Sequence, residues 1–296
     1  MVEGVAYELT RNDGETVERK EVHEIRSNHE ESDTRMILYA AYGAKLKYKV
    51  IQIRSPDSDM FFLLLHFASS ISCTLLFDTG VGNMKRLINV SKVSEDFGQE
   101  YCTALLTLHA YTGCDTTSAF KGIGKVKPMK VFNKNKGLTV CFSKLGMSWD
   151  VNKEMIQDLE AFTCTLYGYP RYKSIDALRH DMLKRKCDGN SKLDPSKAID
   201  LASLPPCAKT LLQHIRRSNL QSGVWRRALE NFLEVPDVTN HGWVVVDGIL
   251  EPLWCEGDLL PDELVDLLEE NNNSESEEEE LANECDVDDD SDYDEI

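Results

Sequence analysis

Apolar residues repeat at helical spacing in several long segments of the chain. Between His29 and Ala44, one face carries Met36, Ile37, Ala40, Ala41 and Ala44, and residues three and four apart share a face of a helix. Acidic residues stand at the start of this segment, where the helix dipole favours them. The same spacing predicts further helices over Gln99–Tyr111, Asn152–Tyr167 and Leu204–Asn231, the last with a basic face.

Shorter β-rich runs lie between the first helices. Tyr48–Ile53, Cys73–Phe77 and Lys85–Val90 each predict a strand. A strand followed by a loop with acids is typical of α/β folds, in which ligands bind beyond the carboxyl ends of parallel strands. Hairpins are expected near the two ends, over Tyr7–Leu9 and Val17–Val22 around Asn12-Asp13-Gly14, and over 243–254 around Asp247-Gly248.

The run from Met60 to Phe77 contains no charged residue over 18 positions. That length could span a membrane. Its interior, however, contains His66 and several serines, and Asp59 and Asp78 bracket it. We favour two buried elements joined by a serine-rich turn, and we expect no membrane partner.

The net charge of −18 is unevenly distributed. Of the 51 acidic residues, 20 lie between Glu256 and Ile296, a segment without Lys or Arg. The rest of the chain therefore carries 31 acids and 33 bases and is close to neutral. Residues 271–296 are too polar to bury a core, which predicts a disordered acidic tail. An alternative is that this tail binds a basic protein partner.

Nine cysteines are scattered along the chain, and none forms a C-x-x-C pair. This spacing does not support a zinc site, and the odd count favours free thiols in a reducing compartment. We therefore expect an intracellular protein and favour the nucleus over the cytoplasm.

Three separated motifs supply candidate metal ligands. They are Glu30-Glu31-Ser32-Asp33 at a helix start, Asp57-Ser58-Asp59 after a strand, and Asp115 in a glycine-flanked turn. Each alone is more simply explained by a solvated helix start, a turn or a helix cap. Together they would repel strongly unless cations neutralised them. Mg²⁺ prefers such oxygen ligands, and a pair of ions about 4 Å apart can assist phosphodiester cleavage.

These motifs resemble a known family in their order and spacing. Residues 28–35, NHEESDTR, resemble the E-A-E-A helix motif of flap-endonuclease-type 5′-nucleases, and SPDSD at 55–59 resembles their E-D-x-D. GCDTT at 113–117, followed by KGIGKVK at 121–127, resembles their G-x-D-Y and G-I-G-P. The match spans roughly Asn28 to Phe132. HEESDTR, SPDSD, FDTG and GCDTTSAFKGIGK also resemble a group of uncharacterised animal proteins with PIN-like domains, for which a transposon origin is one interpretation.

The resemblance implies an α/β PIN-like fold, with a central, mostly parallel sheet flanked by helices. Residues 1–132 would form an incomplete nuclease core with a helix–turn–helix at 116–132, and residues 133–255 a mainly helical extension. The family's catalytic and metal-binding acids correspond to Glu31, Asp33, Asp57, Asp59 and Asp115. The implied cofactors are Mg²⁺ or Mn²⁺, with two ions if the site is complete.

The G-I-G turn of this family holds a nucleic-acid backbone, often with a monovalent cation such as K⁺. Gly122 and Gly124 would let the backbone approach phosphate, and the N-terminus of the following helix would add positive potential. The residues Lys121, Lys125 and Lys127 would add charge. The expected partner is nucleic acid, with DNA favoured over RNA.

The chain departs from the family pattern at two points. No segment before the first motif resembles the family's first strand, which carries an early metal-binding Asp. In addition, Thr116 replaces a tyrosine of the family pattern. Two further hypotheses therefore stand beside a metal-dependent nuclease. One is a catalytically inactive scaffold that binds nucleic acid or protein, and the other is a truncated remnant of a mobile element.

Other polar residues receive more ordinary interpretations. His29 and His109 are expected to be structural, and Cys114 lacks the pattern of a nucleophile. The arginines at 216, 217, 226 and 227 predict a solvated basic face, with phosphate contact as the alternative. No chemical role is expected for residues 133–240.

Overall fold

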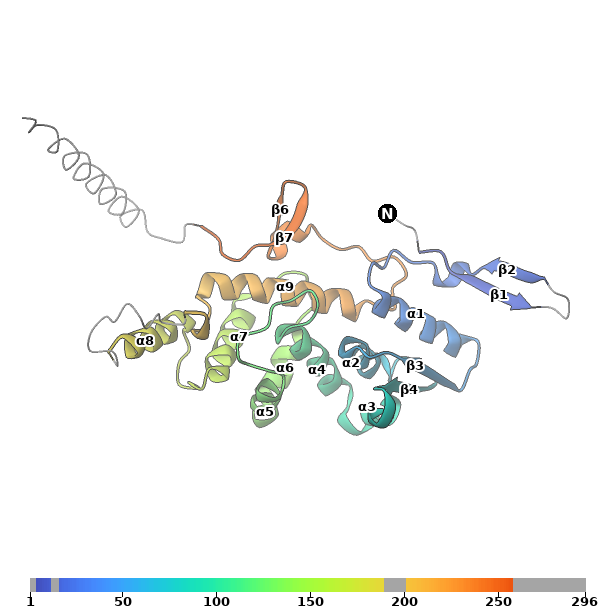
Figure 1. Ribbon diagram of the computed structural model, residues 1–296, viewed down its shortest axis with the longest axis horizontal. Coiled ribbons are helices and arrows are strands. Elements are labelled where there is room, and N and C mark those ends of the chain that lie inside the picture. The colour runs from blue at the N-terminus through green and yellow to red at the C-terminus, as the bar shows by residue number, and fades with distance from the viewer. Residues whose placement is uncertain (1–3, 12–15, 189–200, 258–296) are drawn as a thin grey trace, which may run out of the picture. The chain divides into compact units, whose positions relative to one another are not determined.

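A small sheet of three strands lies beside the first helices. The computed structural model describes residues 4–11, 16–188 and 201–257. β3 (Val50–Arg54) pairs parallel with β4 (Thr74–Thr79), and β4 pairs antiparallel with β5 (Arg86–Asn89). The described residues thus form a mixed α/β fold, as predicted, but the sheet is mixed and contains a single parallel pair (Figure 1).

The connections between the strands explain their directions. α2 (Ser58–Phe67) connects β3 to β4 and is the crossover that a parallel pair requires. Only a short turn connects β4 to β5, so that pair is antiparallel. Gly80 in this turn has a φ of 78°, and a Cβ there would lie 2.2 Å from the carbonyl oxygen of Met84. The turn therefore needs glycine.

The long apolar run divides into α2 and β4, as predicted. Met60, Leu63 and Leu64 of α2 are fully buried, and so is Leu75 of β4. None of the described helices has the length and hydropathy needed to cross a membrane.

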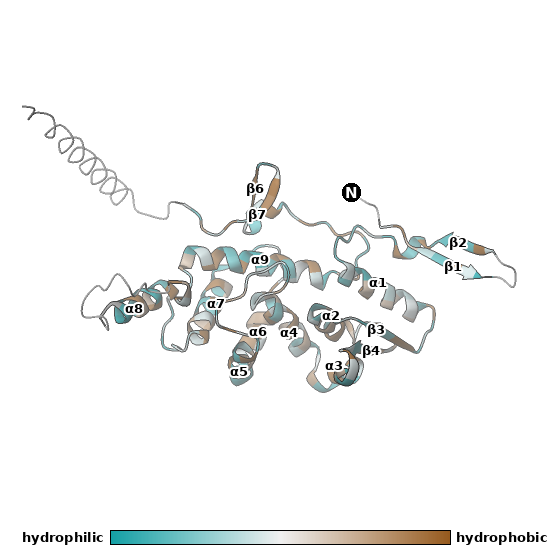
Figure 2. Ribbon diagram, viewed as in Figure 1, coloured by the Kyte–Doolittle hydropathy of each residue, from teal (hydrophilic) through white to brown (hydrophobic). Residues whose placement is uncertain are grey.

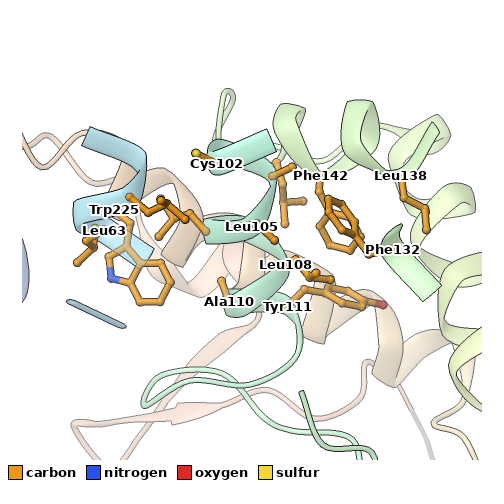
Figure 3. Close-up of a cluster of buried hydrophobic side chains, with 14 of the residues drawn as sticks. Leu63, Cys102, Leu105, Leu108, Ala110, Tyr111, Phe132, Leu138, Phe142 and Trp225 are labelled. Carbon is orange, nitrogen blue, oxygen red and sulfur yellow. The ribbon is translucent and has the colours of Figure 1, made fainter. Parts of the chain in front are cut away.

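The hydrophobic core is centred on α4 (Gln99–Tyr111), which begins and ends where the sequence predicted. Every residue from Cys102 to Tyr111 is buried. α4 packs against α2, α6 (Lys136–Lys144) and α9 (Ala208–Arg226). Leu105, Leu108 and Tyr111 point into a cluster with Phe142 (Figure 3). Residues on both sides of position 132 therefore share one core.

The remaining helices surround this core. They are α1 (Ser32–Lys45), α3 (Val90–Phe97), α5 (Val126–Lys134), α7 (Lys153–Leu166) and α8 (Ile175–Asp188). α9 lies alongside α4 and α7 (Figure 1).

Two hairpins lie outside the sheet. β1 (Tyr7–Arg11) pairs with β2 (Val17–Glu21), and β6 (Trp243–Val246) pairs with β7 (Ile249–Pro252). The β6–β7 hairpin carries hydrophobic residues (Figure 2) that are largely exposed. The predicted turn at Asn12-Asp13-Gly14 and the acidic tail at 271–296 fall outside the described residues.

Residues before α1 are joined to residues after α9 by hydrogen bonds. The side chain of Asn28 donates to the carbonyl of Leu233 (2.9 Å) and accepts from its N–H (2.8 Å). The Asn231 side chain donates to the carbonyls of Glu24 and Arg26. His29 Nε2 lies 2.6 Å from the carbonyl oxygen of Glu230. These bonds fix the start of α1 against the end of α9.

The helix–turn–helix expected at 116–132 is not formed. Within the described residues, 116–125 contain no helix, so α5 is the one helix that begins within the range 116–132. Thr117 pairs with Cys114 in a β-bridge, and its hydroxyl donates to the carbonyl of Ala110 at 2.5 Å. Threonine hydroxyls that bond the backbone compete with helix formation, and Gly122 interrupts the segment at positive φ.

Candidate metal centre

Asp57 and Asp59 stand at the N-terminus of α2, directly after β3. Asp57 caps the helix, because its carboxylate accepts from the N–H of Asp59 at 2.9 Å. The N–H of Asp57 in turn donates to the hydroxyl of Ser55 at 3.0 Å. The cap and the helix dipole both hold the two carboxylates at this strand end. Asp57 is thus both the cap of α2 and one of the two candidate ligands at its N-terminus.

Asp115 is presented by the tight turn after α4. Gly113 has a φ of 107°, and a Cβ there would lie 2.9 Å from the Cα of Ala119. The bridge between Cys114 and Thr117 closes the turn. Asp115 is exposed at its tip.

The carboxylates of Asp57, Asp59 and Asp115 come together. One oxygen from each lies within 4.8 Å of the others, and the three are half-buried, buried and exposed, respectively. An all-oxygen, all-anionic donor set at this separation fits a hard divalent cation such as Mg²⁺ or Mn²⁺. The structure thus brings together residues from two of the three acidic motifs within ligand distance.

Asp33, from the third motif, lies in the same electrostatic environment. Burial and, after it, the carboxylates of Asp57, Asp59, Glu31 and Asp115 together raise the pKa of Asp33 from 3.8 to about 6. An uncompensated set of acids is what a cation site looks like without its cation.

Glu31 precedes α1 as its extended N-cap residue, so the helix begins at Ser32 rather than at His29. Its two carboxylate oxygens accept hydrogen bonds from Gln221 Nε2 at 2.8 Å and from Trp225 Nε1 at 2.9 Å. Both donors belong to α9. They hold Glu31 in place without neutralising its charge.

α9 therefore supplies residues of the site, although no role was expected for residues 133–240. The hydroxyl of Thr116 donates to Gln221 Oε1 at 2.8 Å. Gln221 thereby connects the turn of Asp115 to Glu31. Because 190 positions separate Gln221 from Glu31, no local sequence pattern could have indicated this bond.

His109 is a second residue that the sequence left as merely structural. Its Nε2 lies 2.6 Å from Asp59 Oδ1, and its ring stacks on Phe62 and Trp225 with centroids 4.3 and 6.1 Å away. With an ionised Asp59, Nε2 carries the proton and donates. The packed ring fixes the orientation of this carboxylate.

Lys125 is exposed, but its ammonium group bonds the protein. Its Nζ donates to the carbonyl of His109 (2.8 Å), to the hydroxyl of Thr112 (3.0 Å) and to the carbonyl of Gly113. Burial lowers its pKa to about 8. The ammonium group thus caps the C-terminus of α4, where a cation is favoured. This structural role was not predicted, and phosphate contact by Lys125 stays a prediction.

The neighbouring glycine turn is open. Gly122 has a φ of 73°, and a Cβ at Gly122 or Gly124 would meet nothing within 4 Å. Lys121 and Lys127 are exposed. Phosphate or K⁺ binding at this turn stays a prediction.

Three arginines of the expected basic face bond the backbone instead. Arg217 donates to the carbonyls of Gly242 and Leu253. Arg226 donates to that of Ser143 and Arg227 to those of Gly146, Gly223 and Met147. These side chains connect α9 to its surroundings, so neither solvation nor phosphate contact describes them.

Comparisons of the chain with family models, curated proteins and solved structures gave no match. The likeness to flap-endonuclease-type nucleases therefore depends on the motif residues alone.

The raised pKa of Asp33 predicts a pH-dependent stability effect. A carboxyl group with a higher pKa in the folded state favours folding when protonated, so this contribution is present below pH about 4 and lost as pH rises through about 6. Without divalent cations, Asp33→Asn should therefore be more stable than the wild type at neutral pH, by about 1 kcal/mol after solvent screening.

Urea unfolding in a chelator across this pH range measures the effect. The difference between the two proteins should vanish toward pH about 4. A difference that stays constant with pH would contradict the raised pKa of Asp33.

Proposed function

We propose that this chain is a Mg²⁺- or Mn²⁺-dependent nuclease-like protein that cleaves phosphodiester bonds in DNA or structured nucleic acid. The observation that carries the proposal is the convergence of Asp57, Asp59 and Asp115, with their oxygens within 4.8 Å. The raised pKa of Asp33 supports it, because the carboxylates of Asp57, Asp59 and Asp115 contribute to this shift, although burial is its largest cause.

The side chains have distinct roles under this proposal. Asp57, Asp59 and Asp115 would hold the cation, and Asp33 would complete the negative site. Glu31 is held by Gln221 and Trp225 just before the start of α1, and it would add a further carboxylate to the site. When bound, the divalent ion supplies charge stabilisation for phosphate and an activated water.

A PIN-like arrangement is the finer fold that we propose. It is supported by the parallel pair β3–β4, by its crossover α2 and by the position of the acids at the carboxyl end of β3. Ligands in such sheets bind beyond this end of the strands.

An inactive scaffold that binds nucleic acid is the second candidate. It is favoured by the engagement of both Glu31 oxygens and by the fact that, among the described residues, only three acids reach ligand distance. A scaffold would bind nucleic acid without a requirement for all five carboxylates.

Cleavage of labelled DNA substrates with Mg²⁺, Mn²⁺ or a chelator tests the proposal. Asp115→Asn should lower the metal-dependent rate by about 100-fold, because it removes one charged ligand. Asp115 is exposed and caps no helix, so the variant should fold. Glu30→Gln is the matched control, since Glu30 is exposed and is not among the five acids that correspond to the family's ligands. Cleavage that survives in chelator, or equal rates for both variants, would exclude a metal nuclease centred on this cluster.

A further inference from the structure

The two segments that contain the outer strands of the sheet, β3 and β5, are strongly basic. From Tyr39 to Pro56 and from Thr79 to Ser94 the sequence contains seven Lys or Arg residues and no Asp or Glu, although the chain carries a net charge of −18. The strand register brings the segments together, because Arg54 lies beside Asp78 and Asp78 lies beside Leu87. Asp78 is buried, and Lys85 lies 3.7 Å from it.

The cations of these segments are exposed. Every residue from Lys45 to Val50 is exposed, and so is every residue from Val81 to Leu87. Within the part of the chain that the structure describes, Lys85 is the one cation of this set that pairs with a carboxylate. We call this surface the basic strip; it consists of Lys45, Lys47, Lys49, Arg54, Lys85 and Arg86, together with Tyr39 and Tyr48.

Exposed aromatic rings accompany the charges of the basic strip. Tyr48 stands between Lys47 and Lys49 and is 62% exposed, and Tyr39 is 43% exposed. An exposed ring between cations is poorly suited to water but well suited to stacking of a nucleic-acid base whose phosphates contact the neighbouring lysines. Duplex DNA does not present its bases in this way, so these rings favour a single strand.

Lys47 occupies a position where its side chain is conformationally unfavourable. It lies two residues after the end of α1 with a φ of 69°, and its N–H donates to the carbonyl of Ala44. Glycine is the usual residue at such a helix end, because other residues are strained in the left-handed region. A lysine at this position has no structural advantage over glycine, which is consistent with a role for its charge.

The basic strip leads to the acidic cluster. Arg54 ends β3, and Asp57 follows three positions later. A single nucleic-acid strand that lies along β3 would therefore reach the carboxylates at the C-terminal end of β3.

We propose that the basic strip binds single-stranded nucleic acid and directs it to the Asp57–Asp59–Asp115 cluster. This inference deepens the proposed function, on which it depends for the identity of the anionic ligand. An acidic polypeptide is the other ligand that such a surface could attract, and the experiment below includes it.

Binding of a fluorescein-labelled thymidine oligonucleotide of about 20 nucleotides to the full chain, in chelator, tests the inference by fluorescence anisotropy. Lys47→Glu/Lys49→Glu should weaken binding at least about tenfold and lower the slope of log affinity against log salt by about 1.4, which corresponds to two lost phosphate contacts. Lys153→Glu/Lys173→Glu makes the same charge change on exposed residues outside the strip and should bind like the wild type.

Two further variants separate binding from folding. Lys47→Gly should weaken binding while its melting temperature equals or exceeds that of the wild type, because glycine relieves the left-handed strain. Tyr48→Ala should lower affinity by about 5- to 100-fold with an unchanged salt slope, since stacking carries no charge.

Equal oligonucleotide affinity for the wild type and Lys47→Glu/Lys49→Glu would overturn the inference. So would polyglutamate binding as tight as that of the oligonucleotide. Because the assay contains no divalent cation, its outcome is independent of cleavage. A chain that binds through the strip but never cleaves overturns the proposed nuclease alone, whereas a chain that cleaves with unaltered binding overturns the strip alone.

Discussion

Asp59→Asn is expected to lower metal-dependent cleavage at least about 1,000-fold, which is the loss that follows when several kcal/mol of charge stabilisation are removed. Asp59 is the one buried member of the three-carboxylate cluster. Its charge is therefore screened least by water. Asparagine retains a carbonyl oxygen that can accept from His109 Nε2, so the effect should fall on metal binding rather than on the fold.

Initial rates in saturating Mn²⁺ measure this effect, and circular dichroism establishes that the variant is folded. Asp96→Asn is the control, because Asp96 lies exposed on α3 and carries the same charge. A rate for Asp59→Asn within a few-fold of the wild type would remove Asp59 from the metal site.

Trp225→Ala should reduce the free energy of unfolding by about 3–5 kcal/mol, the usual cost of truncating a buried tryptophan. Trp225 is 2% exposed and packs in the central cluster, where Figure 3 shows it beside Leu63. The substitution also removes the hydrogen bond from Nε1 to Glu31 and leaves that carboxylate with one fewer donor. Urea unfolding measures the loss.

Two companion variants divide this effect into packing and hydrogen bonding. Trp254→Ala should cost less than about 1 kcal/mol, because Trp254 is 58% exposed. Trp225→Phe keeps most of the core volume but lacks the N–H, so it should be moderately stable while binding Mn²⁺ about tenfold more weakly. If Trp225→Phe bound Mn²⁺ as tightly as the wild type, α9 would support the fold without influencing the metal centre.

Elements with a clear periodicity could be predicted from the sequence. The helix over Gln99–Tyr111 has the predicted bounds, because Gly98 and Gly113 flank an uninterrupted apolar pattern. The strand predicted at Tyr48–Ile53 is shifted by about two residues, as expected where burial does not define the ends. The acids of the second and third motifs meet because each follows a regular element whose end the sequence marks.

Contacts between distant residues could not be predicted in this way. The bond from Trp225 to Glu31 joins residues 194 positions apart, and a bond from His109 to Asp59 has no signature in either local pattern. Arg217, Arg226 and Arg227 were misassigned for a related reason. A charged side chain looks the same in a sequence whether it faces solvent or bonds a carbonyl at a helix end.

The bonds that join the start of α1 to the end of α9 also constrain the order of folding. Asn28 and Glu31 meet their partners only after more than two hundred residues have been synthesised. Contacts of such large sequence separation form late, because the loop they close is long. During translation, Glu31 therefore gains its two donors only once α9 has been synthesised, and a chain terminated before α9 would lack the hydrogen bonds that hold this carboxylate.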